Sequence, residues 1–339
     1  MLPLVDSGST IGLQVAVRTA NQTVSVAIGK DAQGNEISTD SVSNFFCLCK
    51  TLTTLTFQSI EETNPGFLST RLSDVDVASG SPIADVTIWE ILTHSSGIWG
   101  DSAEWLMGVS DETAIERIIA GTRSRPRFRG IYGQFGAFHI AGLVAERLLG
   151  VPMEALVRAH VLDALVSDND VYFRNTDLAD RNRMRVSGSR REHGVIPWLW
   201  EMSTIAMTQG SAANGCYATA GGFLGILEMA AANARSGKAH RAALAQQCTK
   251  PGRDPILQRV CSFSLGHLFD LTQHGFGDTI SRWSFGQVGL GGATTCGVDL
   301  ESDVLFCWRD YLVHESVSQV HAIRSTVMNA IRESVATPQ

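Results

Sequence analysis

The stretch SNFFCLCKTLTTLTF, residues 43–57, places two thiols and an amine within four positions. In a helix that starts here, Cys47 and Lys50 share a face, because they are three residues apart, whereas Cys49 lies roughly 200° around the axis from Cys47. A thiol in the first turn of a helix and beside an ammonium group has its thiolate form favoured. The spacing therefore makes Cys47 a candidate nucleophile and Lys50 its neighbouring cation.

Two other interpretations of this stretch need no catalysis by a thiol. Free cysteine is among the most buried residue types, so FFCLC could be core sequence with Lys50 at its solvent edge, and the local sequence alone favours this. A zinc or redox site is less favoured, because Cys47 and Cys49 lack C-x-x-C spacing and no second ligand pair with metal-site spacing occurs. We therefore expect no metal and no cofactor.

The composition indicates which kind of protein this is and which kinds of substrate it can bind. The chain has 339 residues, 44% of them hydrophobic, and a net charge of -7, which is typical of a globular protein and gives no electrostatic reason to bind nucleic acid. Seven scattered cysteines indicate a reducing compartment, and neither a signal peptide nor an apolar run of about 20 residues occurs. The sequence predicts a cytoplasmic protein that does not contact a membrane and acts on a small organic substrate.

The elements that must position these residues follow from the hydrophobic pattern. Residues 11–30 alternate as in a β-hairpin, residues from about 50 to 250 have mostly helical periodicity, and short strands return after about 260. The last stretch places apolar side chains on one face of a helix, namely Val317, Val320, Ile323, Val327 and Ile331. We expect residues 1–50 and 251–339 to form an α/β lobe and residues 51–250 a helical lobe, together one domain.

Five stretches in the same order resemble the serine β-lactamase superfamily, most closely class C β-lactamases, related esterases and acyltransferases. CLCK at 47–50 is similar to the S-x-x-K motif of that fold. The other four stretches are VTIWEILTHSSGI (86–98), GIYGQFGAFHIAGLVAERLLG (130–150), GCYATAGGFLGILEMAAA (215–232) and FGQVGLGG (285–292). The resemblance implies an α+β fold of the β-lactamase/transpeptidase type, in which an antiparallel sheet made by both chain ends is flanked by helices and carries an inserted, mostly helical lobe.

Three positions depart from the family pattern. Cys47 stands for the family serine, Gln134 for the motif asparagine, and Gln287 occupies a position where His or Lys is usual. Each replacement keeps a polar or nucleophilic atom, and Lys50 and Tyr132 are retained. This favours a working but altered site over a decayed one, and the lost cation at 287 weakens the case for a carboxylate-bearing substrate such as a penicillin.

The resemblance implies a role for each of these residues. Cys47 attacks an acyl carbonyl while Lys50 and Tyr132 exchange protons with it and with the leaving group. The backbone N–H groups of Cys47 and of the strand near Leu290 form the oxyanion hole. The expected substrate-binding residues are Gln134, Gln287, Gly289, Trp198 and Trp200. His94 is expected to be a structural helix-end residue, and the arginine-rich run 181–193 to be either a solvated loop or a contact for a phosphopantetheine arm or an acidic carrier protein.

The thiol narrows the reaction class. A thioester intermediate forms readily from another thioester and is attacked well by amines, carbanions and thiols, so Cys47 favours an acyltransferase or cyclase in a biosynthetic pathway. Its acyl donor would be an acyl carrier protein or coenzyme A thioester. Two alternatives remain open at this point: an esterase or amidase that uses the same acyl-enzyme, and a non-catalytic member of the family that binds a ligand in the cleft.

Overall fold

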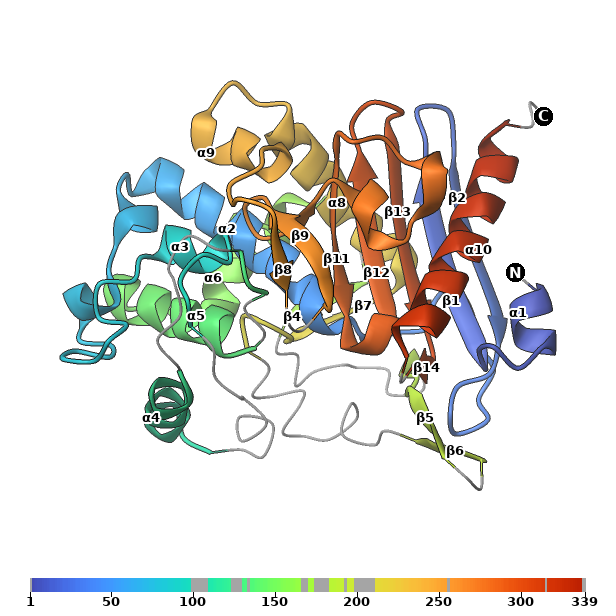
Figure 1. Ribbon diagram of the computed structural model, residues 1–339, viewed down its shortest axis with the longest axis horizontal. Coiled ribbons are helices and arrows are strands. Elements are labelled where there is room, and N and C mark those ends of the chain that lie inside the picture. Colours follow the sequence, from blue (N-terminus) through green and yellow to red (C-terminus); the bar gives the residue numbers. More distant parts are fainter. Residues whose placement is uncertain are drawn as a thin grey trace.

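An eight-stranded antiparallel sheet made by both ends of the chain is the centre of the fold. The computed structural model describes residues 2–98, 109–122, 130–132, 135–165, 170–173, 183–191, 194–197, 211–254, 257–314 and 316–336. The strand order is β2-β1-β13-β12-β11-β10-β9-β8 (Figure 1). The strands are β1 (Gly12–Arg18), β2 (Thr23–Gly29), β8 (Gly252–Asp254), β9 (Arg259–Phe263), β10 (Leu268–Phe269), β11 (Ser284–Gly289), β12 (Thr294–Asp299) and β13 (Val304–Asp310).

The N-terminal hairpin is confirmed, and its alternating pattern divides between the two faces of the sheet. β1 pairs with β2 on one side and β13 on the other. Leu13, Val15 and Val17 of β1 point to one face, where they join a buried cluster with side chains of the C-terminal helix, while Ala16 joins the cluster on the other face. The sheet therefore has two buried faces, each of which needs a helical layer.

Helix α10 (Val317–Ala336) covers one of these faces (Figure 1). Val320, Ile323, Val327 and Ile331 are buried, as their spacing predicts. Val317 is the exception, since it is the first residue of the helix and is 41% exposed. The prediction was therefore right for the helix and wrong for the burial of this one residue.

The opposite face is covered by helices from the middle of the chain. Helix α8 (Ala220–Ala234) packs on β1 and β13, and α2 (Cys49–Thr63) packs between α8 and α6 (Met153–His160). The remaining α-helices are α1 (Leu2–Asp6), α3 (Ile88–Leu92), α4 (Asp111–Gly121), α5 (Phe135–Leu149) and α9 (Ala239–Ala242). The 3-10 turns are η1 (Phe46–Leu48), η2 (Phe67–Ser69), η3 (Leu72–Val75), η5 (Leu162–Ala164), η8 (Ala243–Ala245), η9 (Leu271–His274), η10 (Gly277–Thr279) and η11 (Leu290–Gly292). The α+β class and the antiparallel sheet flanked by helices are confirmed.

Two small sheets lie outside the main one and were not predicted. One has the order β3-β7-β4 and the other β14-β5-β6. Their strands are β3 (Ser43–Asn44), β4 (Val171–Phe173), β5 (Gly188–Arg191), β6 (Gly194–Pro197), β7 (Cys216–Ala218) and β14 (Leu312–Val313). Strands of two to four residues are at or below the shortest run in which an alternation can be recognised, so they carry little readable period.

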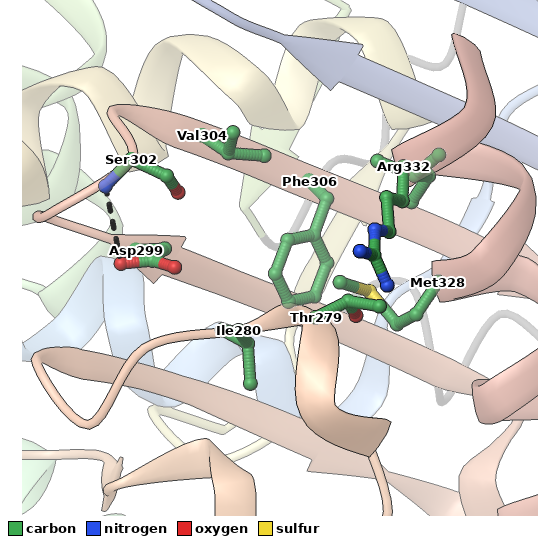
Figure 2. A pocket seen from close by; sticks show the side chains of 9 residues that line it. Thr279, Ile280, Asp299, Ser302, Val304, Phe306, Met328 and Arg332 are labelled. Atoms are coloured by element: carbon green, nitrogen blue, oxygen red, sulfur yellow. Dashed lines mark hydrogen bonds between the residues drawn. The ribbon is translucent and has the colours of Figure 1, made fainter. Parts of the chain in front are cut away.

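A cavity of about 210 Å³ lies between η10, the turn from β12 to β13, and α10 (Figure 2). Ile280, Phe306 and Met328 make its wall apolar. At its edge the carboxylate of Asp299 accepts a hydrogen bond from the backbone N–H of Ser302 at 3.5 Å. This carboxylate therefore stabilises the turn between β12 and β13. None of the candidate catalytic residues lines this cavity.

Among the described helices, none is both long and apolar enough to cross a bilayer.

Candidate active site

Cys47 lies in the 3-10 turn η1, which leads directly into α2. The α-helix itself begins two residues later, at Cys49, so Cys47 precedes the helix where the sequence predicted it in the first turn. Phe46 has a φ of 45°, a left-handed conformation that is strained for a residue with a bulky side chain, and its N–H donates to Asn44 Oδ1 at 2.6 Å. Cys49 is fully buried in the core, as the helical geometry predicted.

Two central strands hold the segment that precedes Cys47. Arg309 of β13 is fully buried, donates through Nε to Ser43 Oγ at 3.1 Å, and places its guanidinium 5.0 Å from the ring centre of Phe46. Thr294 of β12 donates its hydroxyl to the carbonyl of Phe45 at 3.2 Å. Because these contacts flank the strained residue, they compensate for its backbone conformation and fix the position of the thiol.

Lys50 and Tyr132 meet beside Cys47. Lys50 is fully buried, and its Nζ donates to the Tyr132 hydroxyl at 3.4 Å. The same nitrogen lies 5.0 Å from the centre of the Tyr132 ring. Tyr132 is itself fixed through its backbone, because its N–H donates to Asp254 Oδ2 at 2.5 Å. The nitrogen of Lys50 and the hydroxyl of Tyr132 are thus in contact within the site.

The Tyr132 hydroxyl is held in its neutral form. Burial raises the pKa of Tyr132 well above its ordinary value, and the neighbouring Cys47 side chain, which hydrogen-bonds with it, raises the pKa further. Within the described residues the hydroxyl also lies 3.4 Å from the carbonyl of Val288. A neutral phenol can donate a proton to a leaving group when the carbonyl re-forms.

Gln287 contacts the hydroxyl of Tyr132. Its side chain is fully buried, donates through Nε2 to the carbonyl of Gly266 at 2.8 Å, and offers Oε1 to the Tyr132 hydroxyl at 3.5 Å. Gln287 is not among the residues that line the cavity at Cys47. This position favours a role for Gln287 in orienting the Tyr132 hydroxyl.

The end of β11 approaches Cys47 so closely that only glycine fits at position 289. A Cβ atom there would lie 3.1 Å from the backbone nitrogen of Cys47 and 2.3 Å from Thr294 Oγ1. The next residue, Leu290, has a φ of 29° and begins the turn η11. The two backbone amides expected to form an oxyanion hole, those of Cys47 and Leu290, therefore belong to segments that meet at Gly289.

A cavity of about 370 Å³ opens at these residues, which is a volume typical of small-molecule sites. Cys47, Tyr132, Gly289 and Leu290 all line it. Three predicted substrate-binding residues lie outside the described residues, namely Gln134, Trp198 and Trp200. No set of three or more His, Cys, Asp or Glu side chains in the described part of the chain is arranged to hold a metal ion.

His94 supports the site from behind Tyr132. It follows the end of α3 with a φ of 56°, its ring stacks on that of Tyr132 at 5.2 Å between centroids, and its carbonyl accepts the N–H of Ile131 at 3.0 Å. Burial, and then the charge of Lys50, lower the pKa of His94 well below its ordinary value, so the imidazole is neutral. These contacts agree with the structural role expected for it.

Sequence reasoning missed several basic residues of this region. Arg259, His314 and Arg324 also line the cavity at Cys47. Arg324 could have been noticed, because it lies four residues after Val320 and three before Val327, on the apolar face of the last helix. A charged residue on such a face needs a local reason to be there.

The chain combines an antiparallel sheet made by both chain ends, a helical layer on each face, Cys47 and Lys50 at the start of the central helix α2, and Tyr132 in contact with Lys50. This is the arrangement of the penicillin-binding and β-lactamase class of proteins. The family described as Beta-lactamase matches residues 2–308. The chain therefore belongs to the Beta-lactamase family. Among curated proteins, none matches its sequence.

Solved structures show the same fold at low identity. D-amino acid amidase from Ochrobactrum anthropi SV3, complexed with L-phenylalanine amide, is 16% identical with a TM-score of 0.79, over 98% of this chain and 96% of that one. A penicillin-binding protein homologue from Caulobacter crescentus is 16% identical with a TM-score of 0.74, over 96% and 94%. EstCE1, described as a hydrolase with promiscuous acyltransferase activity, is 15% identical with a TM-score of 0.74, over 96% of each chain. At these identities the likeness establishes the fold.

Proposed function

We propose that the protein is an acyltransferase or cyclase that forms a thioester with its substrate at Cys47. The observation that carries the proposal is the position of this thiol, which lines a cavity, hydrogen-bonds with Tyr132 and has its backbone nitrogen at the point where Gly289 approaches. The contact between Tyr132 and Lys50 adds a route for the proton. A thiol, a backbone N–H beside it and a route for its proton are the groups that nucleophilic acyl transfer requires.

The reaction has two halves that share these groups. In the first, the Cys47 thiol gives its proton to the amine of Lys50, since the Tyr132 hydroxyl already carries its own, and its sulfur attacks the acyl carbonyl, whose oxygen becomes an oxyanion held by the N–H groups of Cys47 and Leu290. The carbonyl re-forms as the leaving thiol or alcohol departs with a proton from Tyr132, which Lys50 replaces. In the second half an acceptor loses its proton to the same pair and attacks the thioester, and the thiol of Cys47 is regenerated.

Sulfur in place of oxygen favours transfer over hydrolysis. A thioester reacts well with amines, thiols and carbanions, and it is formed from another thioester with little change in bond energy. We therefore propose an activated acyl donor, such as an acyl carrier protein or coenzyme A thioester of a biosynthetic pathway. A second candidate is an esterase or amidase, in which water is the acceptor, and membership of the Beta-lactamase family favours it. It shares the acyl-enzyme with the transferase and differs only in the molecule that attacks this intermediate.

The nature of the nucleophile provides the test. Cys47→Ser restores the family residue, so with an acyl thioester donor and an amine acceptor we expect the ratio of hydrolysis to transfer to rise, while Cys47→Ala abolishes both. Cys248→Ala is the matched control, because Cys248 is a partly exposed thiol outside the cavity. If Cys47→Ala turned over the substrate at the wild-type rate, Cys47 would not be the nucleophile. The non-catalytic interpretation of this residue would then remain.

A further inference from the structure

A cavity with an apolar wall lies between η10, the turn from β12 to β13, and α10 (Figure 2), and we call it the Met328 cavity. It is separate from the cavity at Cys47, because none of the described residues lines both. Its volume of about 210 Å³ is larger than the roughly 150 Å³ of an engineered apolar cavity that binds benzene. A small apolar molecule therefore fits in the Met328 cavity.

Buried side chains from the sheet and from α10 form the apolar part of the wall. Phe306 of β13 is fully buried, and Met328 and Ile331 of α10 are 3% and 6% exposed. Ile280, which follows η10, belongs to the same hydrophobic cluster. An apolar group among these side chains gains dispersion contacts and loses contact with water, and both effects favour binding.

Arg332 is the only cation among the described residues that line this cavity. It is an exposed residue in the last turns of α10, and Figure 2 shows its guanidinium extended toward Phe306 and Met328. No hydrogen bond or ion pair joins it to another described residue. Its N–H donors are therefore available to a ligand at the solvent side of the cavity.

The acid on the cavity wall is used by the protein itself. Asp299 accepts the hydroxyl of Ser281 on Oδ1 at 2.5 Å and the backbone N–H of Ser281 on Oδ2 at 2.8 Å. Its Oδ1 also accepts the backbone N–H of Glu301 at 3.1 Å. Both oxygens thus bind donors of neighbouring turns, and neither pairs with Arg332, so a negative charge for this arginine has to come from a ligand.

We propose that the Met328 cavity is a binding site for a small carboxylic acid with an apolar body. The body, a phenyl ring or a chain of roughly six carbons by volume, lies against Phe306 and Met328. The carboxylate meets the guanidinium of Arg332, whose paired N–H groups match its two oxygens. The inference goes beyond the proposed function, because this cavity does not include Cys47.

The affinities of an acid and of its amide provide the first test. 3-Phenylpropionate and 3-phenylpropanamide share one apolar body and differ in charge, so calorimetry with both separates the apolar contact from the contact with Arg332. We expect the acid to bind about fivefold more tightly, the upper range for an ion pair exposed to solvent, and Arg332→Gln to remove this difference without weakening the amide. Arg282→Gln is the matched control, since the Arg282 side chain is 86% exposed and does not line the cavity. Equal affinities of acid and amide in the wild type would overturn the proposal.

A substitution that fills the cavity provides the second test. Val304 lines it at the partly exposed start of β13, so Val304→Phe places a ring in the space that the ligand would occupy. We expect this variant to bind neither compound, whereas Val24→Phe, at an exposed valine of β2 outside the cavity, should bind both as the wild type does. Circular dichroism decides whether Val304→Phe is folded, and Arg332→Gln carries the test if it is not. Wild-type affinity for both compounds in folded Val304→Phe would contradict the site.

Labelling of Cys47 distinguishes the Met328 cavity from the cavity at Cys47. An acid that entered the latter would slow alkylation of the thiol by iodoacetamide. We expect 3-phenylpropionate, at a concentration that saturates the site seen by calorimetry, to leave the alkylation rate unchanged. Protection of Cys47 at the same affinity, retained in Arg332→Gln and Val304→Phe, would place the acid at Cys47 and overturn the proposal. Binding is measured without turnover, so these results do not depend on whether Cys47 is a nucleophile.

Discussion

Replacing Gly289 with alanine tests whether the close approach of β11 to Cys47 forms an oxyanion hole. The added Cβ would lie 2.3 Å from Thr294 Oγ1 and 3.1 Å from the backbone nitrogen of Cys47. The first distance is far inside van der Waals contact, so β11 must shift, and overpacking of this kind costs about 1–3 kcal/mol of the free energy of unfolding. The second places a methyl group beside the N–H that would bind the oxyanion.

A second substitution separates these two effects. Thr294→Ala removes the atom that meets the new methyl group, at the cost of the hydrogen bond to Phe45, which is about 1 kcal/mol. We expect the double variant Gly289→Ala/Thr294→Ala to be more stable than the sum of the single changes predicts, because the two sites are in contact. Acylation of Cys47 should not recover, since the methyl group still stands beside the amide.

The rates of two reactions at Cys47 provide the assay. Acylation by an activated ester passes through an oxyanion, and loss of one oxyanion-hole donor reduces such a rate by about 10²–10³-fold. Alkylation by iodoacetamide forms no oxyanion, so Gly289→Ala should leave it near the wild-type rate. Two results would refute the oxyanion hole at this position. One is acylation of Gly289→Ala at the wild-type rate, and the other is a double variant in which both the acylation rate and the stability return to wild-type values.

Three further predictions follow from the contacts of the site and of its support. Tyr132→Phe should reduce the acylation rate by about 10²-fold or more, because it removes the proton donor but keeps the ring, whereas Tyr172→Phe, a tyrosine outside the cavity, should not; equal rates in the two variants would exclude proton transfer by Tyr132. Lys50→Met should slow alkylation of Cys47 by iodoacetamide at neutral pH, and an unchanged rate would remove Lys50 from the site. Burial lowers the pKa of His267 to about 4, so the folded state excludes a proton that the unfolded chain binds, and stability should fall by about 2 kcal/mol between pH 7 and pH 5. His267→Gln should lose this part of the pH dependence in urea denaturation, and a variant with the wild-type pH profile would contradict the assignment.

The fold was predictable because its signals are long and periodic. The hairpin of residues 11–30 alternates over two strands, and the last helix repeats its apolar face over about four turns. The order of five motifs along the chain identified the family. The short strands β3 to β7 could not be predicted, since strands of two to four residues pair through tertiary contacts and carry no period of their own.

The candidate catalytic residues were identifiable only through their motifs, and the other residues that line the cavity were not identifiable from the sequence. Cys47, Lys50 and Tyr132 stand in stretches similar to those of the family, and the structure brings all three together. Arg259 and Arg324 are 65 positions apart in sequence and share a cavity only because the fold brings residues of β9 and α10 to one cavity wall. No spacing rule connects such residues, although the charge of Arg324 on an apolar helix face was a visible signal.

The mass of the protein after reaction with an acyl donor tests the central claim most directly. We expect incubation with a short-chain acyl thioester to add the mass of one acyl group, peptide mapping to place it on Cys47, and an amine acceptor to remove it. Cys47→Ala should acquire no adduct, while Cys248→Ala should acquire one as the wild type does. Absence of any adduct on Cys47, together with turnover of the same thioester by Cys47→Ala, would contradict the acyl-enzyme.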